Sequence, residues 1–515
     1  MSKDKSSRQV PADQGSNQVN HNQTRTAASQ TRGMGGRGRG RGPYGHPVGP
    51  MVKPENLGKT LVRIGSYLKQ DIPHLIMVVI TILVNTACTL AGPLVIGSTI
   101  DRYIITGDFY GLVWASITLI AIYGVNSLST YVQGSLMASI SQKTVTRMRK
   151  DLFTKYQTLS LKFFDNHTHG ELMSRLTNDI DTVSMVLSFG LTQFISGLIT
   201  IIGTIVLMLA KSLILTLIVL AIVPLMILIT RLITKHTGKL FIEQQKTLGE
   251  LNGKIEETIS GQRVVKLFCR EEQVIHEFEE SNQLLKKTAL KAQVLSRIMG
   301  PTMNMLNNLG FAFVAGIGGL LALKGTTGTV TIGTISVFLN YSRQFTRPIN
   351  ELANQFNMVL SAAAGAERVF QVLDHDPEPA DAPDAIDIRE KGVKGYVEFD
   401  NVSFAYDDEN LVLKDFSLKV KPGQTVALVG PTGAGKTTVI NLLTRFYDVK
   451  EGSICIDGVD IRRIKRNSLR SSLGIVLQDT YLFNASVREN IRYGRLTATD
   501  EEVEQAAKTA NAHGF

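Results

Sequence analysis

Long stretches without a charged side chain recur along the first two thirds of the chain. Six of them lack Asp, Glu, Lys and Arg, and they cover residues 72–100, 109–142, 182–210, 212–230, 298–323 and 325–342. A helix that crosses a bilayer needs about 20 mostly apolar residues. The long buried helices of a soluble protein are the alternative, but such helices carry charges at helical intervals to form a wet face. The pattern therefore predicts six transmembrane helices, the last closely followed by Arg343, Arg347 and Glu351.

Basic residues between these stretches predict which side of the membrane each loop faces. The short connections carry one basic residue each, at Arg102, Lys211 and Lys324. The segments 143–181 and 231–297 are rich in Lys and Arg, and their apolar residues recur at helical spacing. Because cytoplasmic loops carry an excess of Lys and Arg, we expect the N-terminus, both long loops and the C-terminal region in the cytoplasm. The spacing also predicts that the spanning helices continue into both loops.

The hydrophobic pattern changes after residue 373. Three prolines and seven acidic residues crowd the segment 374–393, which predicts a connector instead of a helix. Residues 397–404 then alternate apolar and polar side chains, as in a half-buried strand. The run 425–429 is typical of a short buried strand, and apolar residues recur at helical spacing over 439–446. We therefore predict a helical membrane domain over 57–373, a linker over 374–393 and an α/β domain over 394–515.

An octapeptide between the last predicted strand and helix carries recognisable chemistry. Gly430-Pro431-Thr432-Gly433-Ala434-Gly435-Lys436-Thr437 fits the phosphate-loop pattern G-x-x-x-x-G-K-[ST]. Its glycines allow backbone N–H groups to turn toward phosphate oxygens, and the following helix adds the positive end of its dipole. Lys436 can reach the β- and γ-phosphates, and the Thr437 hydroxyl can bind Mg²⁺. A chance match among 45 glycines is the alternative, but the flanking strand and helix favour a site for ATP and Mg²⁺.

The overall composition is typical of a membrane protein, and the N-terminal tail differs in composition from the rest of the chain. Hydrophobic residues make up 43% of the chain and charged residues 19%, which is low for a soluble protein. Residues 1–56 are basic, rich in Gly and Arg and poor in apolar side chains, which predicts a disordered cytoplasmic tail. The run Arg37–Gly42 resembles an RNA-binding tract, but we expect solvation or contact with anionic lipid instead, and no nucleic-acid partner. The three cysteines lie far apart and predict neither a metal site nor a disulfide framework.

Six predicted spans fused to a C-terminal phosphate loop resemble a half-transporter of the ATP-binding cassette (ABC) exporters, a family that includes bacterial multidrug and lipid exporters. The similarity covers about residues 57–515. Segments within 163–179 and 257–268 resemble the cytoplasmic loops that couple the spans to the nucleotide domains in that family. The resemblance implies coupling roles for Phe164, Asp165, Gly170, Glu171, Leu172, Arg175, Asp179 and Gly261.

The first of these loops also has a pattern that can be interpreted physically. Leu172 and Leu176 lie four residues apart, so both fall on one helix face that could dock in a groove. We expect Glu171, Arg175 and Asp179 to stay in solvent. An ordinary amphipathic helix would show the same pattern.

The resemblance extends the predicted nucleotide site beyond the phosphate loop. Tyr406 matches the aromatic residue that stacks on adenine, although a surface tyrosine at a strand end would look the same. Gln478 matches the Q-loop glutamine, which contacts Mg²⁺ and the attacking water and which we therefore assign a catalytic role. The residues implied to bind ATP are Tyr406, Gly430, Thr432, Gly433, Ala434, Gly435, Lys436, Thr437 and Thr438, and those implied to bind Mg²⁺ are Thr437 and Gln478.

Several family motifs do not occur before Phe515. They are the Ser-Gly-Gly-Gln signature, the Walker B aspartate, the catalytic glutamate and the switch histidine; His513 has no strand context and is not assigned. The visible part of the domain is locally consistent, so we expect a sequence truncated at its C-terminus. The fragment would then lack the catalytic glutamate and the signature that complete an ABC ATPase. A membrane regulator or gated channel that binds ATP without hydrolysis is the alternative if the natural chain ends at Phe515.

The predicted function is ATP-driven export of a small amphipathic substrate, drug or lipid across the bacterial cytoplasmic membrane. A second half-transporter would complete the pathway, and the basic glycine-rich leader, similar to leaders of heterodimeric exporters, favours a heterodimer over a homodimer. A peptide exporter is a further alternative, although no cysteine-peptidase domain is visible. Polar residues inside spans are costly unless they face a cavity or another helix. The cargo-contact candidates are Asn304, Asn307, Asn308, Asn340 and Tyr341.

Overall fold

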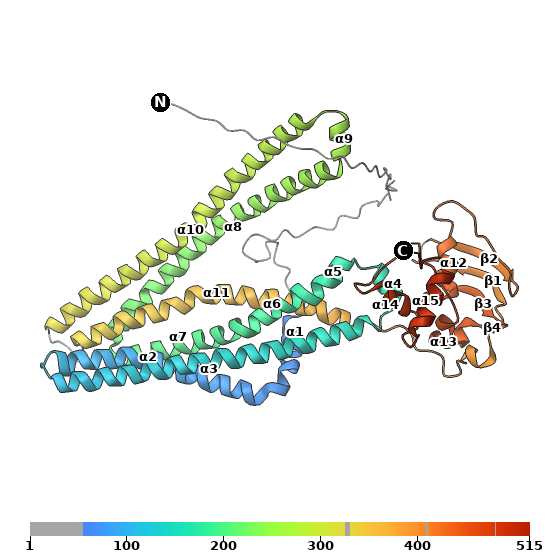
Figure 1. The fold of residues 1–515 in the computed structure, drawn as a ribbon. Helices are drawn as coiled ribbons and strands as arrows, with labels where there is room; N and C mark the ends of the chain where they lie inside the picture. The colour runs from blue at the N-terminus through green and yellow to red at the C-terminus, as the bar shows by residue number, and fades with distance from the viewer. Residues whose placement is uncertain (1–54, 325–329, 408–409, 479, 515) are drawn as a thin grey trace, which may run out of the picture. The chain divides into compact units, whose positions relative to one another are not determined.

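The computed structural model describes residues 55–324, 330–407, 410–478 and 480–514. The predicted tail therefore lies almost wholly outside the described residues. The described chain is helical as far as Asp374 (Figure 1). In order, the α-helices are α1 (Leu57–Leu68), α2 (Ile72–Thr99), α3 (Phe109–Tyr156), α4 (Leu161–Asp165), α5 (His169–Ser174), α6 (Ile180–Met185), α7 (Leu191–Lys211), α8 (Leu213–Ser260), α9 (Gln262–Leu267), α10 (Glu271–Lys324) and α11 (Ile332–Asp374).

Five helical segments in the described part of the chain are long and apolar enough to cross a membrane. They are Leu57–Ile104, Phe109–Tyr156, His169–Lys211, Leu213–Ser260 and Glu271–Leu323. The sixth predicted span starts within 325–329, outside the described residues. Helix α11 contains the rest of this span, residues 332–342, and packs against α2 and α7, but Arg343, Arg347 and Glu351 end its apolar run. The prediction of a sixth crossing therefore stays a prediction, while the five others match in place and in their extension beyond the uncharged stretches.

The end of α2 and the start of α11 approach each other through two glycines. A Cβ atom on Gly97 would lie 2.7 Å from the Gly333 carbonyl oxygen, and one on Gly333 would lie 2.1 Å from the Gly97 carbonyl oxygen. The Asp101 carboxylate accepts hydrogen bonds from the Gly333 N–H at 2.8 Å and from the Thr331 hydroxyl at 2.5 Å. These contacts fix the first turn of α11 against α2.

Gly333→Ala is expected to lower the free energy of unfolding by at least about 2 kcal/mol, because the added methyl group would overlap backbone atoms that cannot move aside. Thermal unfolding of the purified protein in detergent would show this as a lower midpoint. Gly124→Ala is the control, since nothing lies within 4 Å of a Cβ atom there. An unchanged midpoint in Gly333→Ala would contradict the close approach of the two helices.

A hydrophobic cluster joins the ends of α1, α3 and α11 to the short helices α4, α5 and α6. Val145, Met148 and Leu152 of α3 pack in it against Phe163, and the last turns of α11 contribute Phe370. Helices α2 and α3 lie side by side (Figure 1). Because the cluster ties the short helices to both α3 and α11, the first loop is held rigidly to the spanning helices.

Residues 240–289 form a separate unit that contains the end of α8, helix α9 and the start of α10. Within it Thr247 and Thr288 share a hydrogen bond of 3.1 Å between the two long helices. Gly261 directly precedes α9 as its N-cap, and the turn ends at Cys269, whose φ of 51° lies in the left-handed region. The prediction that the second loop is helical is therefore confirmed.

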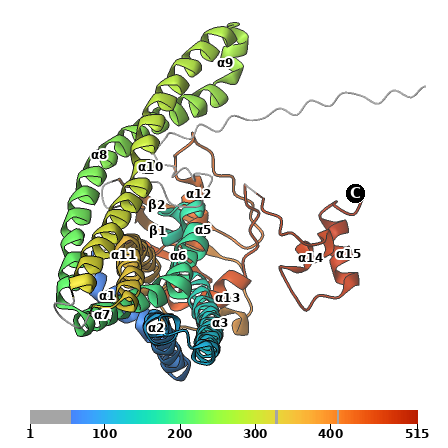
Figure 2. The ribbon, with the colours of Figure 1, turned by 90° about the vertical axis from the view of Figure 1, so that its left-hand side faces the viewer.

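The C-terminal part contains a four-stranded antiparallel sheet in the order β2-β1-β3-β4. Its elements are β1 (Val397–Phe404), β2 (Leu413–Val420), α12 (Lys436–Leu443), β3 (Glu451–Ile456), β4 (Val459–Asp460), α13 (Arg466–Ser471), α14 (Val487–Arg492) and α15 (Asp500–Thr509). Phe399, Ile454 and Leu442 pack in its core, which joins the sheet to α12 and α13. Helices α14 and α15 pack against each other (Figure 2).

The strand predicted over 425–429 is not formed. This segment has no ladder partner among the described residues, and Val426, Leu428 and Val429 stay 39%, 37% and 89% exposed. An apolar run records a tendency toward burial, but a strand also needs neighbours for its N–H and C=O groups. The prediction for 397–404 is confirmed as β1, although a register shift between Phe399 and Val402 interrupts its simple alternation.

Candidate functional site

The phosphate loop leads from the irregular segment 424–430 into α12. Gly433 and Gly435 have φ angles of +89° and +84°, which L side chains rarely adopt. Gly435 is also the N-cap of α12, and a Cβ atom on it would lie 2.8 Å from Cδ2 of Leu413. The backbone conformation therefore favours glycine at both positions, and packing on β2 adds a second requirement at Gly435, since nothing lies within 4 Å of a Cβ atom on Gly433.

Lys436 starts α12, and its side chain folds back over the loop. Its Nζ donates to the carbonyl oxygens of Gly430 and Pro431, both at 2.8 Å. The positive charge is therefore held where the loop and the N-terminus of α12 meet, the place where an anion is best stabilised. Of the neighbouring threonines, Thr437 is exposed and available to a metal ion, while Thr438 is 4% exposed and faces the domain. Thr432 and Ala434 are exposed in the same loop.

Tyr406 is brought to the phosphate-loop helix although 32 residues separate it from Thr438. Its hydroxyl shares a 3.1 Å hydrogen bond with Thr438 Oγ1 and accepts one of 3.3 Å from Asn441 Nδ2. Edge-to-face contacts with Phe404 at 4.9 Å and Tyr447 at 5.0 Å fix the ring from the other side. Tyr406 as a whole is 38% exposed, so a flat base has room to stack on it beside the loop.

Gln478 is not brought to the loop in this structure. It lies in an exposed segment without regular structure, after Val476 and Leu477, which are 95% and 63% exposed. Across the described residues, no hydrogen bond joins its side chain to residues 430–438. The geometry therefore unites Tyr406, the loop and Thr438, and leaves Gln478 apart from them.

In the first loop, the residues exposed to solvent differ from those that the sequence predicted. Arg175 and Asp179 are 8% and 7% exposed, whereas both were expected in solvent. The Asp179 carboxylate accepts a bidentate pair of hydrogen bonds from Arg368 of α11, one of them 2.8 Å from Nε, and Arg175 donates to Glu171 at 2.5 Å. A π-helical turn at Arg175–Asp179 changes the helical phase and directs these residues toward α11. The predicted solvent exposure is therefore wrong for both residues.

Leu172 and Leu176 do not dock on the nucleotide domain. They pack within the cluster formed by α3, α6 and α11. Contact with the domain is made instead by α4, where Leu161 packs against the domain core and the Tyr447 hydroxyl donates to Asp165 Oδ2. Burial, together with this hydrogen bond, raises the pKa of Tyr447, so its hydroxyl keeps the proton it donates. Phe164 supports α4 by packing edge-on against Phe163, whereas a Cβ atom on Gly170 would meet nothing within 4 Å.

Three arginines on or beside α13 form ion pairs with the acidic connector. The sequence had assigned no role to them. Arg463 pairs with Asp384, Arg466 with Asp381, and Arg470 with Glu378. The density of acids in the connector was visible in the sequence. Their partners were not, because the pairs join residues about 80 to 90 positions apart.

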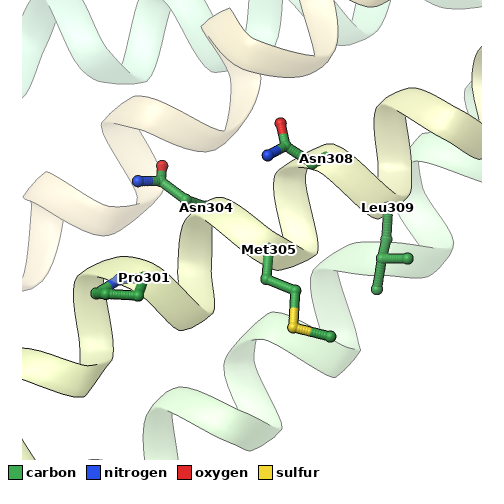
Figure 3. Close-up of a pocket in the computed structure, with 5 residues that line it drawn as sticks. All are labelled: Pro301, Asn304, Met305, Asn308 and Leu309. Carbon is green, nitrogen blue, oxygen red and sulfur yellow. The ribbon is translucent and has the colours of Figure 1, made fainter.

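Two of the cargo-contact candidates share a surface hollow on α10. Asn304 and Asn308 line an open cavity of about 610 Å³ together with Pro301, Met305 and Leu309. Figure 3 shows the two amides on one side of the helix and the Met305 and Leu309 side chains on another. The hollow therefore offers hydrogen-bonding groups next to apolar surface.

The remaining candidates are placed differently. Asn307 lies on α10 and is half-buried outside this hollow, and the Asn340 amide donates to the Ser336 carbonyl oxygen of its own helix at 2.9 Å. Tyr341 is fully buried, and its hydroxyl donates to the Leu90 carbonyl oxygen at 2.7 Å. Helix–helix hydrogen bonding explains Tyr341, so its prediction as a cargo contact is not supported by this geometry.

Matches to known families agree with this combination of long apolar helices and phosphate loop. Residues 75–349 match the ABC transporter transmembrane region, and residues 413–515 match the family described as ABC transporter. The chain therefore belongs to the ABC transporter family, with a transmembrane region and an ATP-binding domain in one polypeptide.

Individual relatives support the same assignment. The chain is 50% identical over 482 residues to the uncharacterized ABC transporter ATP-binding protein YfiC of Bacillus subtilis, and the match covers 92% of this chain and 79% of YfiC. It is 42% identical over 396 residues to a fatty acid ABC transporter ATP-binding/permease protein of Mycobacterium bovis, covering 77% of this chain and 62% of that protein. It is 34% identical over 443 residues to an ATP-dependent lipid A-core flippase of Syntrophus aciditrophicus, covering 86% and 73%.

Proposed function

We propose that this chain is half of an ATP-driven exporter that moves a small amphipathic molecule, drug or lipid across the bacterial cytoplasmic membrane. The observation that carries the proposal is the phosphate loop, with the Lys436 side chain folded over it and Tyr406 beside it, in a chain whose helices are long and apolar enough to cross a membrane. ATP would lie with its phosphates in the loop and its base on Tyr406. Thr437 would bind the Mg²⁺ that accompanies ATP, and Gln478 would join the site once its segment is ordered against it.

The working unit in this proposal is a dimer of half-transporters. Residues 57–373 would supply the membrane domain and residues 394–515 the phosphate-loop face of an ATP site. By the excess of Lys and Arg in the long loops, the N-terminus and the ATP-binding domain would lie in the cytoplasm. The basic leader in residues 1–56 favours a related second subunit over an identical one. Chemical crosslinking of the native membrane followed by mass spectrometry would distinguish a heterodimer from a homodimer.

A lipid-like cargo fits the hollow on α10. Asn304 and Asn308 can hydrogen-bond a polar headgroup, while Met305 and Leu309 offer apolar contact to a chain or ring. Two relatives carry the names of lipid transporters, one for fatty acid and one for lipid A-core. ATP-dependent movement of a fluorescent fatty acid into inside-out vesicles tests the function directly. No movement of this probe or of an amphipathic cationic dye would contradict it.

Asn308→Leu is expected to raise the apparent KM for the fluorescent fatty acid about threefold to tenfold, because one hydrogen bond to the headgroup is lost. ATP hydrolysis without cargo should not change. Asn340→Leu is the matched control, since that amide is bound to its own helix. Equal KM values for the two variants would show that the hollow on α10 does not contact the cargo.

A further inference from the structure

Arg470 closes the far end of the phosphate-loop helix. Its guanidinium donates to the carbonyl oxygens of Thr444 at 3.3 Å and Arg445 at 3.0 Å, directly after the last turn of α12. A cation there meets free carbonyl groups and the negative end of the helix dipole. The guanidinium also lies 5.0 Å from the centre of the Phe446 ring. Arg470 is therefore bound at three points to the C-cap and the two residues after it, which directly follow the helix that begins at Lys436.

Glu378 of the connector holds the same guanidinium from the other side. Its Oε1 accepts from Arg470 Nη2 at 2.6 Å and its Oε2 from Nη1 at 3.3 Å. The two side chains are only 28% and 30% exposed, so water screens the pair in part. Arg466 Nε lies 3.7 Å from this carboxylate and adds a second positive charge. Because two parallel hydrogen bonds join the guanidinium to the carboxylate, they fix the relative orientation of the two groups as well as their distance.

The backbone of Glu378 is bound to the helical region. Its N–H donates to the Thr158 carbonyl oxygen at 2.7 Å, two residues after α3 ends at Tyr156. Helix α11 ends at Asp374, only four residues before Glu378. Glu378 therefore hydrogen-bonds to the residue two positions after α3, lies four residues after the end of α11, and pairs with the arginine bound at the end of α12.

We infer that Glu378 and Arg470 form a coupling joint that passes movement of the phosphate-loop helix to α3 and α11 of the same chain. The inference rests on the proposed function, because it requires ATP to move α12. Phosphate binding acts at the Lys436 end of α12, and a helix of this length moves as a rigid body, so its far end carries Arg470 with it. The bidentate contact then pulls on Glu378, and the Thr158 hydrogen bond and the short connector pull on the two long helices.

Another acid of the connector provides a matched control. Asp384 pairs with Arg463 at 3.1 Å, but these side chains are 64% and 69% exposed. Across the described residues, neither of them bonds to α12 or to the end of α3. Asp384→Asn and Glu378→Gln therefore remove the same charge from the same connector, and only the second breaks the joint.

The test is amide hydrogen exchange of the full-length transporter with its partner subunit in nanodiscs, with and without ATP and Mg²⁺. In the wild type, ATP should slow exchange in peptides of the phosphate loop and change exchange in the peptide that covers residues 150–165. In Glu378→Gln, we expect the loop to be protected as before, while the change over 150–165 falls at least about threefold. Asp384→Asn should match the wild type.

Several outcomes would overturn the joint. One is an equal response over 150–165 in Glu378→Gln and Asp384→Asn, and another is a wild type whose loop is protected without any response there. Faster exchange throughout Glu378→Gln even without ATP would mean that the pair only holds the fold. Arg470→Lys, which keeps the charge but loses the bidentate contact, repeats the test if Glu378→Gln does not fold. A wild-type phosphate loop that ATP does not protect would instead contradict the proposed function.

Discussion

Lys436→Ala is expected to weaken ATP binding about 10- to 100-fold and to stop ATP-driven transport, because it removes the positive charge that the loop holds for phosphate. The structure holds this charge at the loop through the carbonyl oxygens of Gly430 and Pro431, both at 2.8 Å. A phosphate oxygen would replace these neutral acceptors with a charged one, which is the stronger partner. Titration with a fluorescent ATP analogue would measure the affinity, and uptake into inside-out vesicles the transport.

Lys508→Ala is the control for this experiment, because it removes an exposed lysine from α15 in the same domain. Its affinity and transport should equal those of the wild type. Unchanged ATP affinity together with unchanged transport in Lys436→Ala would refute the assignment of the phosphate loop. Lost transport with unchanged affinity would place the lysine in hydrolysis instead of binding.

Arg368→Ala is expected to lower the free energy of unfolding by about 2 to 4 kcal/mol, because it leaves the Asp179 carboxylate buried without its partner. That side chain is 11% exposed and receives two hydrogen bonds from Arg368, whose own side chain is 30% exposed. The pair joins the first loop to α11 at the point where a Cβ atom on Gly365 would lie 3.2 Å from the Asp179 carbonyl oxygen. Thermal unfolding in detergent would measure the loss.

An exposed ion pair nearby is the control that distinguishes the effect of burial from the effect of losing an ion pair. Arg149 pairs with Asp181, but their side chains are 43% and 59% exposed, so Arg149→Ala should cost less than about 1 kcal/mol. The double variant Asp179→Asn/Arg368→Ala should recover part of the loss, because it removes the unpaired charge. Similar losses for Arg368→Ala and Arg149→Ala would show that burial of Asp179 has no energetic consequence.

The phosphate loop could be predicted from the sequence because its chemistry is local. The site needs two glycines with positive φ, a lysine and a threonine, and all of them lie within eight positions. Their spacing in the sequence is therefore enough to identify the site. Tyr406 needed a family resemblance, since its contact with Thr438 joins residues 32 positions apart. Tyr447 was missed, because a tyrosine after a helix gives no local signal that it will meet Asp165, 282 positions earlier.

The first loop shows where the same reasoning failed. Helical spacing placed Arg175 and Asp179 on a wet face, whereas a π-helical turn and the approach of Arg368 bury both residues. Leu172 and Leu176 were predicted to share an apolar face, and they do, but α3 and α11 cover that face instead of the nucleotide domain. A periodic pattern identifies an amphipathic helix, but it cannot identify the partner of each face.

The sequence by itself determined the class of this protein, because a span requires a run of apolar residues and a phosphate loop requires a short string, both of which are continuous in the chain. It also located the acidic connector and the predicted cytoplasmic extensions of the helices. Only the tertiary structure decided which acids of that connector meet which arginines, and that Glu378 stands between Arg470 and Thr158. Those contacts join residues far apart in sequence, so their positions follow from packing, which no local pattern records.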